Sequence, residues 1–165
     1  MNNKQINFPI YEGHFMTVAP VVDQSINILR FRDEEQNPYN ILINRVTLLE
    51  GKTPEEFCDD QVERMQRFVP GFSEEGKRLT HEIGPAKLPL IQMANKYLED
   101  GKWVKQVISV ITLPYHPRIN PAKRNLIIFT LAVDEDFTES QRKHYVKIIN
   151  SFVPFEDEAA VKANG

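Results

Sequence analysis

Side chains that could carry out acid–base, nucleophilic or metal chemistry are scattered along this chain. The four histidines are His14, His81, His116 and His144, and none is spaced from another histidine, a cysteine or a carboxylate as metal ligands are. His144 lies among charged neighbours and is expected to be solvated. The single cysteine, Cys58, cannot form an internal disulfide and is expected to be buried or half-buried. No glycine-rich phosphate loop or nucleophile motif occurs, so we expect no catalytic residue, no metal and no cofactor, and no enzyme.

Composition narrows the class of protein further. The chain has 165 residues, 41% of them hydrophobic, which suits one compact domain. Its 20 basic and 23 acidic residues are dispersed, so the sequence predicts no nucleic-acid binding. The apolar run 126–133 has the length of a strand, and no segment reaches the roughly 20 residues of a membrane span. With no export signal at the start, the expected location is the cytoplasm, without membrane insertion.

Two segments carry helix start and stop signals. Thr53-Pro54-Glu55-Glu56 has a capping residue, a proline suited to the first helical position and a capping-box glutamate, and Pro70-Gly71 ends the segment. A second capping-box pattern begins at Thr138, and that helix is expected to stop before Pro154 with its apolar stripe in the core.

Most of the remaining chain alternates with a period of two residues, which predicts strands. Asp100-Gly101 is a strong hairpin signal, because both positions of a tight turn need positive φ. The order of strands and helices predicts an α+β fold, a mostly antiparallel twisted sheet with two helices, in one domain over residues 1–155 followed by a short, acidic, disordered tail over 156–165. The expected strands are 15–18, 25–32, 40–48, 77–83, 90–99, 102–113 and 125–133.

The expected sheet is apolar on both faces. Two helices are expected to cover about one face, which should leave a polar second face on a lone monomer. In the strand 25–32, however, Ile26 and Ile28 point to one side, and Leu29 and Phe31 point to the other. Either the second face packs under loops or against a second copy of the chain, or it forms a groove for a ligand or partner.

Amides stand among the apolar residues of one face. Asn40 and Asn44 flank Leu42, and Gln106 lies between Val104 and Ile108. On the first helix, Gln61, Met65 and Val69 follow one another at intervals of four and share a stripe. A surface of this kind is costly to leave in water and costly to bury without hydrogen-bond partners. It would suit a protein segment that is mainly apolar and carries a few hydrogen-bonding groups.

The stretch Asp23-Gln24-Ser25-Ile26-Asn27-Ile28 resembles the early strand motif of the DcrB-related effector-associated (Eag) chaperones of type VI secretion. Further points agree in order: Arg45, Gln61, Pro70-Gly71-Phe72 and Gln106-Val107. The resemblance runs from about Phe8 to Pro154. It implies a Mog1/PsbP-like fold, a homodimer, and a role in shielding the N-terminal transmembrane helices of PAAR or Rhs effectors and helping to load them on the secretion spike.

The resemblance implies that apolar and amide side chains have different roles in binding the client, which is the transmembrane helix of the effector. The apolar residues would pack on a transmembrane helix, and the amides would supply the hydrogen bonds that membrane helices use among themselves. Core packing is the competing explanation for each apolar residue. The expected client-binding residues are Gln24, Ile26, Ile28, Asn40, Leu42, Asn44, Gln61, Met65, Val69, Val104, Gln106 and Ile108.

Three other functions remain open at this point. A binding or regulatory module of the same fold would act on a soluble partner, whose surface should be polar or charged. An enzyme on an α+β scaffold would need a pocket with a shifted acid or base. A periplasmic lipoprotein like DcrB itself would need an export signal.

Overall fold

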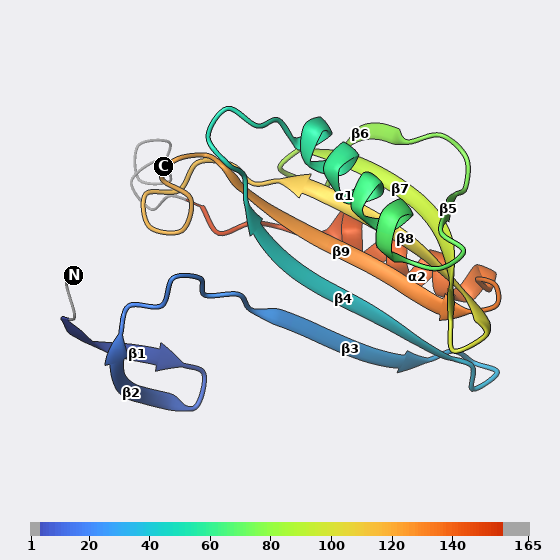
Figure 1. Cartoon of the computed structure of the whole chain (residues 1–165), viewed down its shortest axis with the longest axis horizontal. Helices are drawn as coiled ribbons and strands as arrows, with labels where there is room; N and C mark the ends of the chain where they lie inside the picture. The colour runs from blue at the N-terminus through green and yellow to red at the C-terminus, as the bar shows by residue number, and fades with distance from the viewer. Residues whose placement is uncertain (1–3, 157–165) are drawn as a thin grey trace.

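A computed structural model of the chain describes residues 4–156 (Figure 1). The expected tail therefore lies, apart from Glu156, outside the described residues. The elements in chain order are β1 (Gln5–Ile10), β2 (Gly13–Val18), β3 (Ile26–Arg32), β4 (Pro38–Thr47), α1 (Pro54–Phe68), β5 (Ser73–Glu74), β6 (Leu79–Ile83), β7 (Leu88–Glu99), β8 (Lys102–Thr112), β9 (Asn125–Asp134) and α2 (Glu139–Ser151).

One large antiparallel sheet forms the body of the protein. Its strands follow the order β3-β4-β9-β8-β7-β5, and β6 also pairs with β7. This confirms the α+β class with two helices and an antiparallel sheet. The expected hairpin at Asp100-Gly101 joins β7 to β8, and both residues have positive φ (51° and 76°) as the turn requires.

The sequence missed β1 and the two-residue β5. It placed 15–18 among the strands of the main sheet, but β2 pairs with β1 in a separate two-stranded sheet. Figure 1 shows this hairpin away from the main sheet. Gln5–Ile10 contains Pro9, which weakens the strand signal, and a hairpin without further neighbours has no larger pattern to reveal it.

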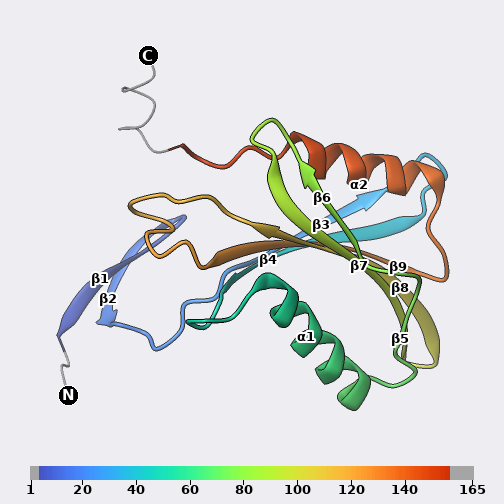
Figure 2. The same cartoon turned by 90° about the horizontal axis from the view of Figure 1, so that it is seen from above.

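The two helices lie on opposite faces of the sheet, as Figure 2 shows. The expectation that both cover one face was wrong. Under α2, Tyr145 and Ile149 are buried with Ile41, Ile111 and other residues of the central strands. Under α1, a smaller cluster joins Cys58 and Val62 to the sheet. The apolar character of both sheet faces is therefore partly core, because each face has its own helix.

Helix α1 begins and ends where the local sequence requires. The Thr53 hydroxyl accepts a hydrogen bond from the Glu56 amide, and the Glu56 carboxylate accepts one from the Thr53 amide. Cys58 is fully buried on the inner side, and burial raises the pKa of its thiol to about 11. After the cap at Val69, Gly71 turns the chain with φ of 68°.

Helix α2 is anchored through Tyr145. The Tyr145 hydroxyl donates to the Phe129 carbonyl at 3.0 Å and pairs with the Ser109 hydroxyl at 2.5 Å. Burial raises the pKa of this phenol well above its ordinary value. The expected solvation of His144 was wrong, because this half-buried ring lies against Phe31, and its Nδ1 pairs with the Tyr39 hydroxyl at 2.7 Å.

Asp33 ties the β3–β4 turn to the start of α2. One carboxylate oxygen accepts from the amides of Glu35 and Asn37 at 3.0 and 2.8 Å. The other accepts from Thr138 and Gln141, each at 3.4 Å. Burial alone would raise the pKa of Asp33, but the hydrogen bonds, led by those from Asn37, outweigh burial and hold the pKa below its ordinary value.

We expect Asp33→Asn to lower the melting temperature at neutral pH. A lowered folded-state pKa stabilises the fold above the unfolded pKa, and that stabilisation is lost as the pH falls through the folded pKa. The gap between the natural chain and the variant should therefore shrink as the pH falls through and below 3.8, the ordinary pKa of an aspartate, which thermal melts followed by circular dichroism can measure. The matched control is Glu34→Gln in the same turn, and an equal effect of the control would contradict this role for Asp33.

Candidate binding groove

Strand register brings most of the expected client-binding residues onto one face of the sheet. In antiparallel pairs, residues opposite each other share a face. Ile28 lies opposite Leu42, and Ile26 lies opposite Asn44. Three rows cross the sheet on this face: Ile26–Asn44–Ile128–Val110–Ile91, Ile28–Leu42–Thr130–Ile108–Met93 and Arg30–Asn40–Ala132–Gln106–Asn95.

Helix α1 covers only part of this face. Its buried contacts are with Ile91, Met93 and Val110 of β7 and β8 and with the neighbouring strand β9. Toward β4 the helix leaves a hollow of about 260 Å³, here called the α1 groove. The α1 groove is lined by Leu42, Asn44, Phe57, Gln61, Met65, Met93, Tyr97, Gln106, Ile108, Val110, Ile128, Thr130 and Ala132.

Six of the expected residues line the α1 groove together. They come from β4, from α1 and from β8, which lie far apart in the sequence. The helix contributes its residues because a spacing of four keeps them on one stripe. The six are Leu42, Asn44, Gln61, Met65, Gln106 and Ile108.

The other expected residues lie around the groove or apart from it. Asn40 and Val104 line an adjoining hollow of about 250 Å³ that shares Leu42 with the α1 groove. Ile26 and Ile28 are 54% and 55% exposed and extend the same face onto β3. Two positions are not brought in: Val69 caps the end of α1, and Gln24 lines a different hollow beside the β2–β3 linker.

The α1 groove has the chemistry of a binding surface. None of its lining residues is charged. Its only titratable side chain is Tyr97, and burial, followed by the nearby charges of Glu99 and Asp134, raises the pKa of that phenol. A neutral phenol beside amides and aliphatic groups can bind and orient a partner, and it offers no acid–base pair for catalysis.

Two amides on this face have buried oxygens that no group satisfies. The side-chain Oδ1 atoms of Asn44 and Asn95 are buried without a hydrogen-bond partner. Elsewhere, buried amides are satisfied: Asn120 donates to the carbonyls of Leu113 and Pro114 and accepts from the Asn125 amide. An unpaired buried carbonyl costs about 1–3 kcal/mol, so a donor from a bound partner would relieve that cost.

Sequence reasoning missed Asn95, Tyr97 and Met93. The signal was present, because Ile91, Met93, Asn95 and Tyr97 alternate along β7 and so share one face. The sequence did not show the strand order. In the sheet β7 lies two strands from β9, and these β7 side chains share a face with Leu42 and Asn44 of β4. Phe57 was also missed, although it lies four residues before Gln61 and continues the same stripe of α1.

The described residues hold no metal-type cluster: over 4–156, no three histidine, cysteine or acidic side chains are grouped as ligands would be. Nor does that part of the chain contain a helix long and apolar enough to cross a membrane.

Comparison with known proteins identifies the family. The DcrB family model matches residues 12–151, which include the main sheet and both helices. The chain belongs to the DcrB family. Its resemblance to the Eag branch of DcrB-related proteins goes further than this match and is taken up as a proposal below. A search of curated proteins gave no match.

One solved structure shows the same fold as this DcrB-family chain. The crystal structure of PA94 from Pseudomonas aeruginosa, a protein of unknown function, is 16% identical with a TM-score of 0.63, covering 92% of this chain and 98% of that one. LpqN of Mycobacterium tuberculosis, involved in cell envelope biogenesis, is 12% identical with a TM-score of 0.46, covering 92% of this chain and 76% of that one.

Proposed function

We propose that this DcrB-family protein is a non-catalytic cytoplasmic chaperone that binds and shields the N-terminal transmembrane helices of a type VI secretion effector of the PAAR or Rhs type. In this role it helps to load the effector on the secretion spike. The observation that carries the proposal is the α1 groove: an uncharged, largely apolar hollow whose amides include an unpaired buried oxygen on Asn44.

The chemistry of the groove matches that of a transmembrane helix. Such a helix in water exposes apolar surface worth about 25 cal/mol per Å², and it aggregates unless that surface is covered. Leu42, Ile108 and the half-exposed Ile26 and Ile28 offer apolar contact along one face. Met65 is unbranched and flexible, so it can adapt to clients of differing shape.

The amides of the groove would orient the client helix through hydrogen bonds. Membrane helices associate through small residues and interhelical hydrogen bonds from serine, threonine and amide groups. Gln61 on α1 and Gln106 on β8 face the groove from two elements, with Asn44 on β4 as the third. A client helix with hydroxyl or amide donors would be held in one register, whereas a purely aliphatic one would leave Asn44 unpaired.

Co-expression with the N-terminal segment of a PAAR- or Rhs-type effector from the same genome tests the proposal. We expect a soluble complex on affinity purification, and we expect it to disappear when the effector's apolar helices are deleted. The matched control deletes an equally long polar segment of the effector and should keep the complex. A complex that survives loss of the apolar helices would instead support the alternative, a regulatory or adaptor module for a soluble partner.

A further inference from the structure

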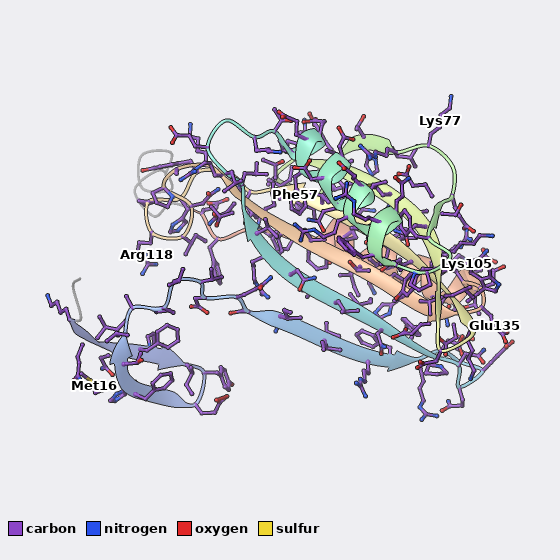
Figure 3. All side chains as sticks on the ribbon, viewed as in Figure 1. Met16, Phe57, Lys77, Lys105, Arg118 and Glu135 are labelled. Atoms are coloured by element: carbon purple, nitrogen blue, oxygen red, sulfur yellow. The ribbon has the colours of Figure 1, made fainter. Side chains whose placement is uncertain are left out.

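Strand β3 forms one edge of the main sheet, and its outer side is open. β3 pairs only with β4, from Ile26 opposite Asn44 to Arg32 opposite Pro38. Figure 3 shows no other strand or helix of residues 4–156 along the outer side of β3. The other end of the sheet differs, because β5 and β6 pair with β7 there. An open edge strand is a template for pairing with another chain.

Hydrogen bonds at the β3–β4 turn show which backbone groups of β3 point outward. The Asp33 amide donates to the Asn37 carbonyl at 3.0 Å, and these two residues continue the register of the strand pair. In antiparallel pairing, residues that bond the neighbouring strand alternate with residues whose amide and carbonyl point away from it. The residues whose backbone groups point into the open edge are therefore Ile26, Ile28, Arg30 and Arg32.

Pairing on the other side of β4 agrees with this assignment. The Leu48 amide donates to the Arg124 carbonyl at 2.7 Å, which continues the β4–β9 register. Even-numbered residues of β4 therefore bond β9, and odd-numbered residues bond β3. Pro38, which has no amide hydrogen, lies at an even-numbered position, where β3 requires none. The outward direction of the even-numbered β3 residues thus follows from two separate hydrogen bonds.

The side chains of the four outward residues lie on the same face as the α1 groove. Ile28 lies opposite Leu42, which lines that groove. Ile26 and Ile28 are 54% and 55% exposed. Arg30 and Arg32 are exposed too, and neither forms an ion pair with any residue of 4–156. The edge therefore combines two apolar side chains, two unpaired guanidinium groups and open backbone groups.

We propose that the edge of β3 binds an extended segment of the effector, next to its apolar helix, as an added antiparallel strand. This inference rests on the proposed function and names a second element that the chaperone recognises beside the helix. From its N-terminus the segment would alternate as acidic, any, acidic, any, apolar, any, apolar. The acidic side chains would lie opposite Arg32 and Arg30, and the apolar ones opposite Ile28 and Ile26.

An extended segment can bond this edge, whereas a helix cannot. A helix uses its own amides and carbonyls internally, so a helix in the α1 groove would leave the outward groups of β3 unpaired. The row Ile28–Leu42–Thr130–Ile108 runs from the edge into the groove on one face, so the chain that leaves the helix can reach the edge. Main-chain bonds would then supply affinity, and alternate side chains would supply specificity.

A second copy of β3 matches this edge less well. With all four outward residues paired, two antiparallel copies would place Ile28 opposite Arg30 and Ile26 opposite Arg32. Four arginines would then share one ribbon with no carboxylate opposite them. Acidic side chains of an effector segment would instead form charge-assisted hydrogen bonds with both guanidinium groups of one copy.

Residue-resolved hydrogen exchange by NMR tests the pairing directly. The full chain is measured free and bound to the N-terminal segment of a PAAR- or Rhs-type effector from the same genome. In the free protein the amides of Leu29 and Phe31 should be protected, and those of Ile28 and Arg30 should exchange freely. In the complex the exchange of the Ile28 and Arg30 amides should slow by about tenfold or more. Leu29 and Phe31 serve as internal controls, because their amides already bond β4.

Two variants at one position separate the backbone from the side chain. Arg30→Pro removes the outward amide hydrogen, and proline is tolerated on an edge strand where that hydrogen faces solvent. Arg30→Val loses the same charge but keeps the amide. In titration, Arg30→Pro should bind the effector segment about tenfold more weakly than Arg30→Val. Circular dichroism checks the fold of both variants, and if Arg30→Pro does not fold, the exchange measurement decides alone.

The outcomes separate this inference from the chaperone proposal. If the Ile28 and Arg30 amides exchange as freely in the complex as in the free protein, or if two folded Arg30 variants bind equally, the added strand is overturned and the chaperone proposal stands. Protection of these amides in the free protein that grows with its concentration would assign the edge to a second copy and would also overturn the inference. The absence of any complex would overturn both proposals.

Discussion

Replacing Ile26 and Ile28 together by aspartate should abolish effector capture while leaving the protein folded. Both side chains are about half exposed on the edge strand β3, so the charges enter water in the free protein. In a complex with an apolar helix they would be desolvated without partners. We expect the affinity to fall by roughly 100-fold or more, measured by co-purification with the effector segment and by titration.

The other side of the same strand supplies the control. Leu29 is 38% exposed and lies on the α2 face, opposite Ile41 rather than Leu42. Leu29→Asp should therefore leave capture intact. Circular dichroism and a thermal melt report on the fold of each variant. Unfolding of the Ile26 and Ile28 variant would show these residues to be core, and retained capture would remove β3 from the binding surface.

Replacing Asn44 by leucine should move stability and binding in opposite directions. The buried Oδ1 of Asn44 has no partner in the free protein, so its removal should raise the free energy of unfolding by about 1 kcal/mol. In the complex the same oxygen accepts a hydrogen bond from the client, so the variant should bind about 5–10-fold more weakly. Urea denaturation and titration with the effector segment measure the two effects.

Asn120→Leu is the informative comparison for Asn44. Asn120 is equally an amide, but it is buried with its hydrogen bonds made, so its loss should destabilise the protein and leave affinity unchanged. If Asn44→Leu also destabilised the free protein, its amide would be structural. If Asn44→Leu bound the effector as tightly as the natural chain does, Asn44 would not accept a hydrogen bond from the client.

Much of the fold could be predicted because local signals agreed with the tertiary structure. Capping boxes at Thr53 and Thr138 mark the starts of both helices, and period-two alternation marks the long strands. The placement of the helices could not be predicted in the same way. Both stripes are amphipathic, and nothing local distinguishes a helix that packs on one sheet face from a helix that packs on the other.

The sequence could predict the arrangement of candidate site residues where periodicity alone decides which residues share a face. Leu42 and Asn44 alternate with Ile41 and Ile43 in β4, so the two pairs point to opposite faces of the sheet. Pairing of β4 with β9 then places residues of β9 on the same face as Leu42 and Asn44. Val69 does not line the α1 groove, because α1 ends at Phe68 and Val69 is its capping residue. The alternation of β7 indicated which face Asn95 shares, but its unpaired buried oxygen is a property of the packed structure that no sequence pattern records.

The arrangement of α1 and α2 on opposite faces also divides the protein into units of unequal local stability. Helix α1 fully buries only Cys58 and Val62, with partly buried Phe57 packed beside them, and the ion pairs Lys52–Asp60 and Arg78–Asp59 add to its contacts. Such a helix can detach while the sheet and α2 stay folded. In native-state hydrogen exchange of the free protein, the amides of α1 should open at lower free energy than those near Tyr145. Such opening would widen the α1 groove by partial unfolding of a single helix. A bound effector should slow the exchange of the α1 amides, because it stabilises the folded helix.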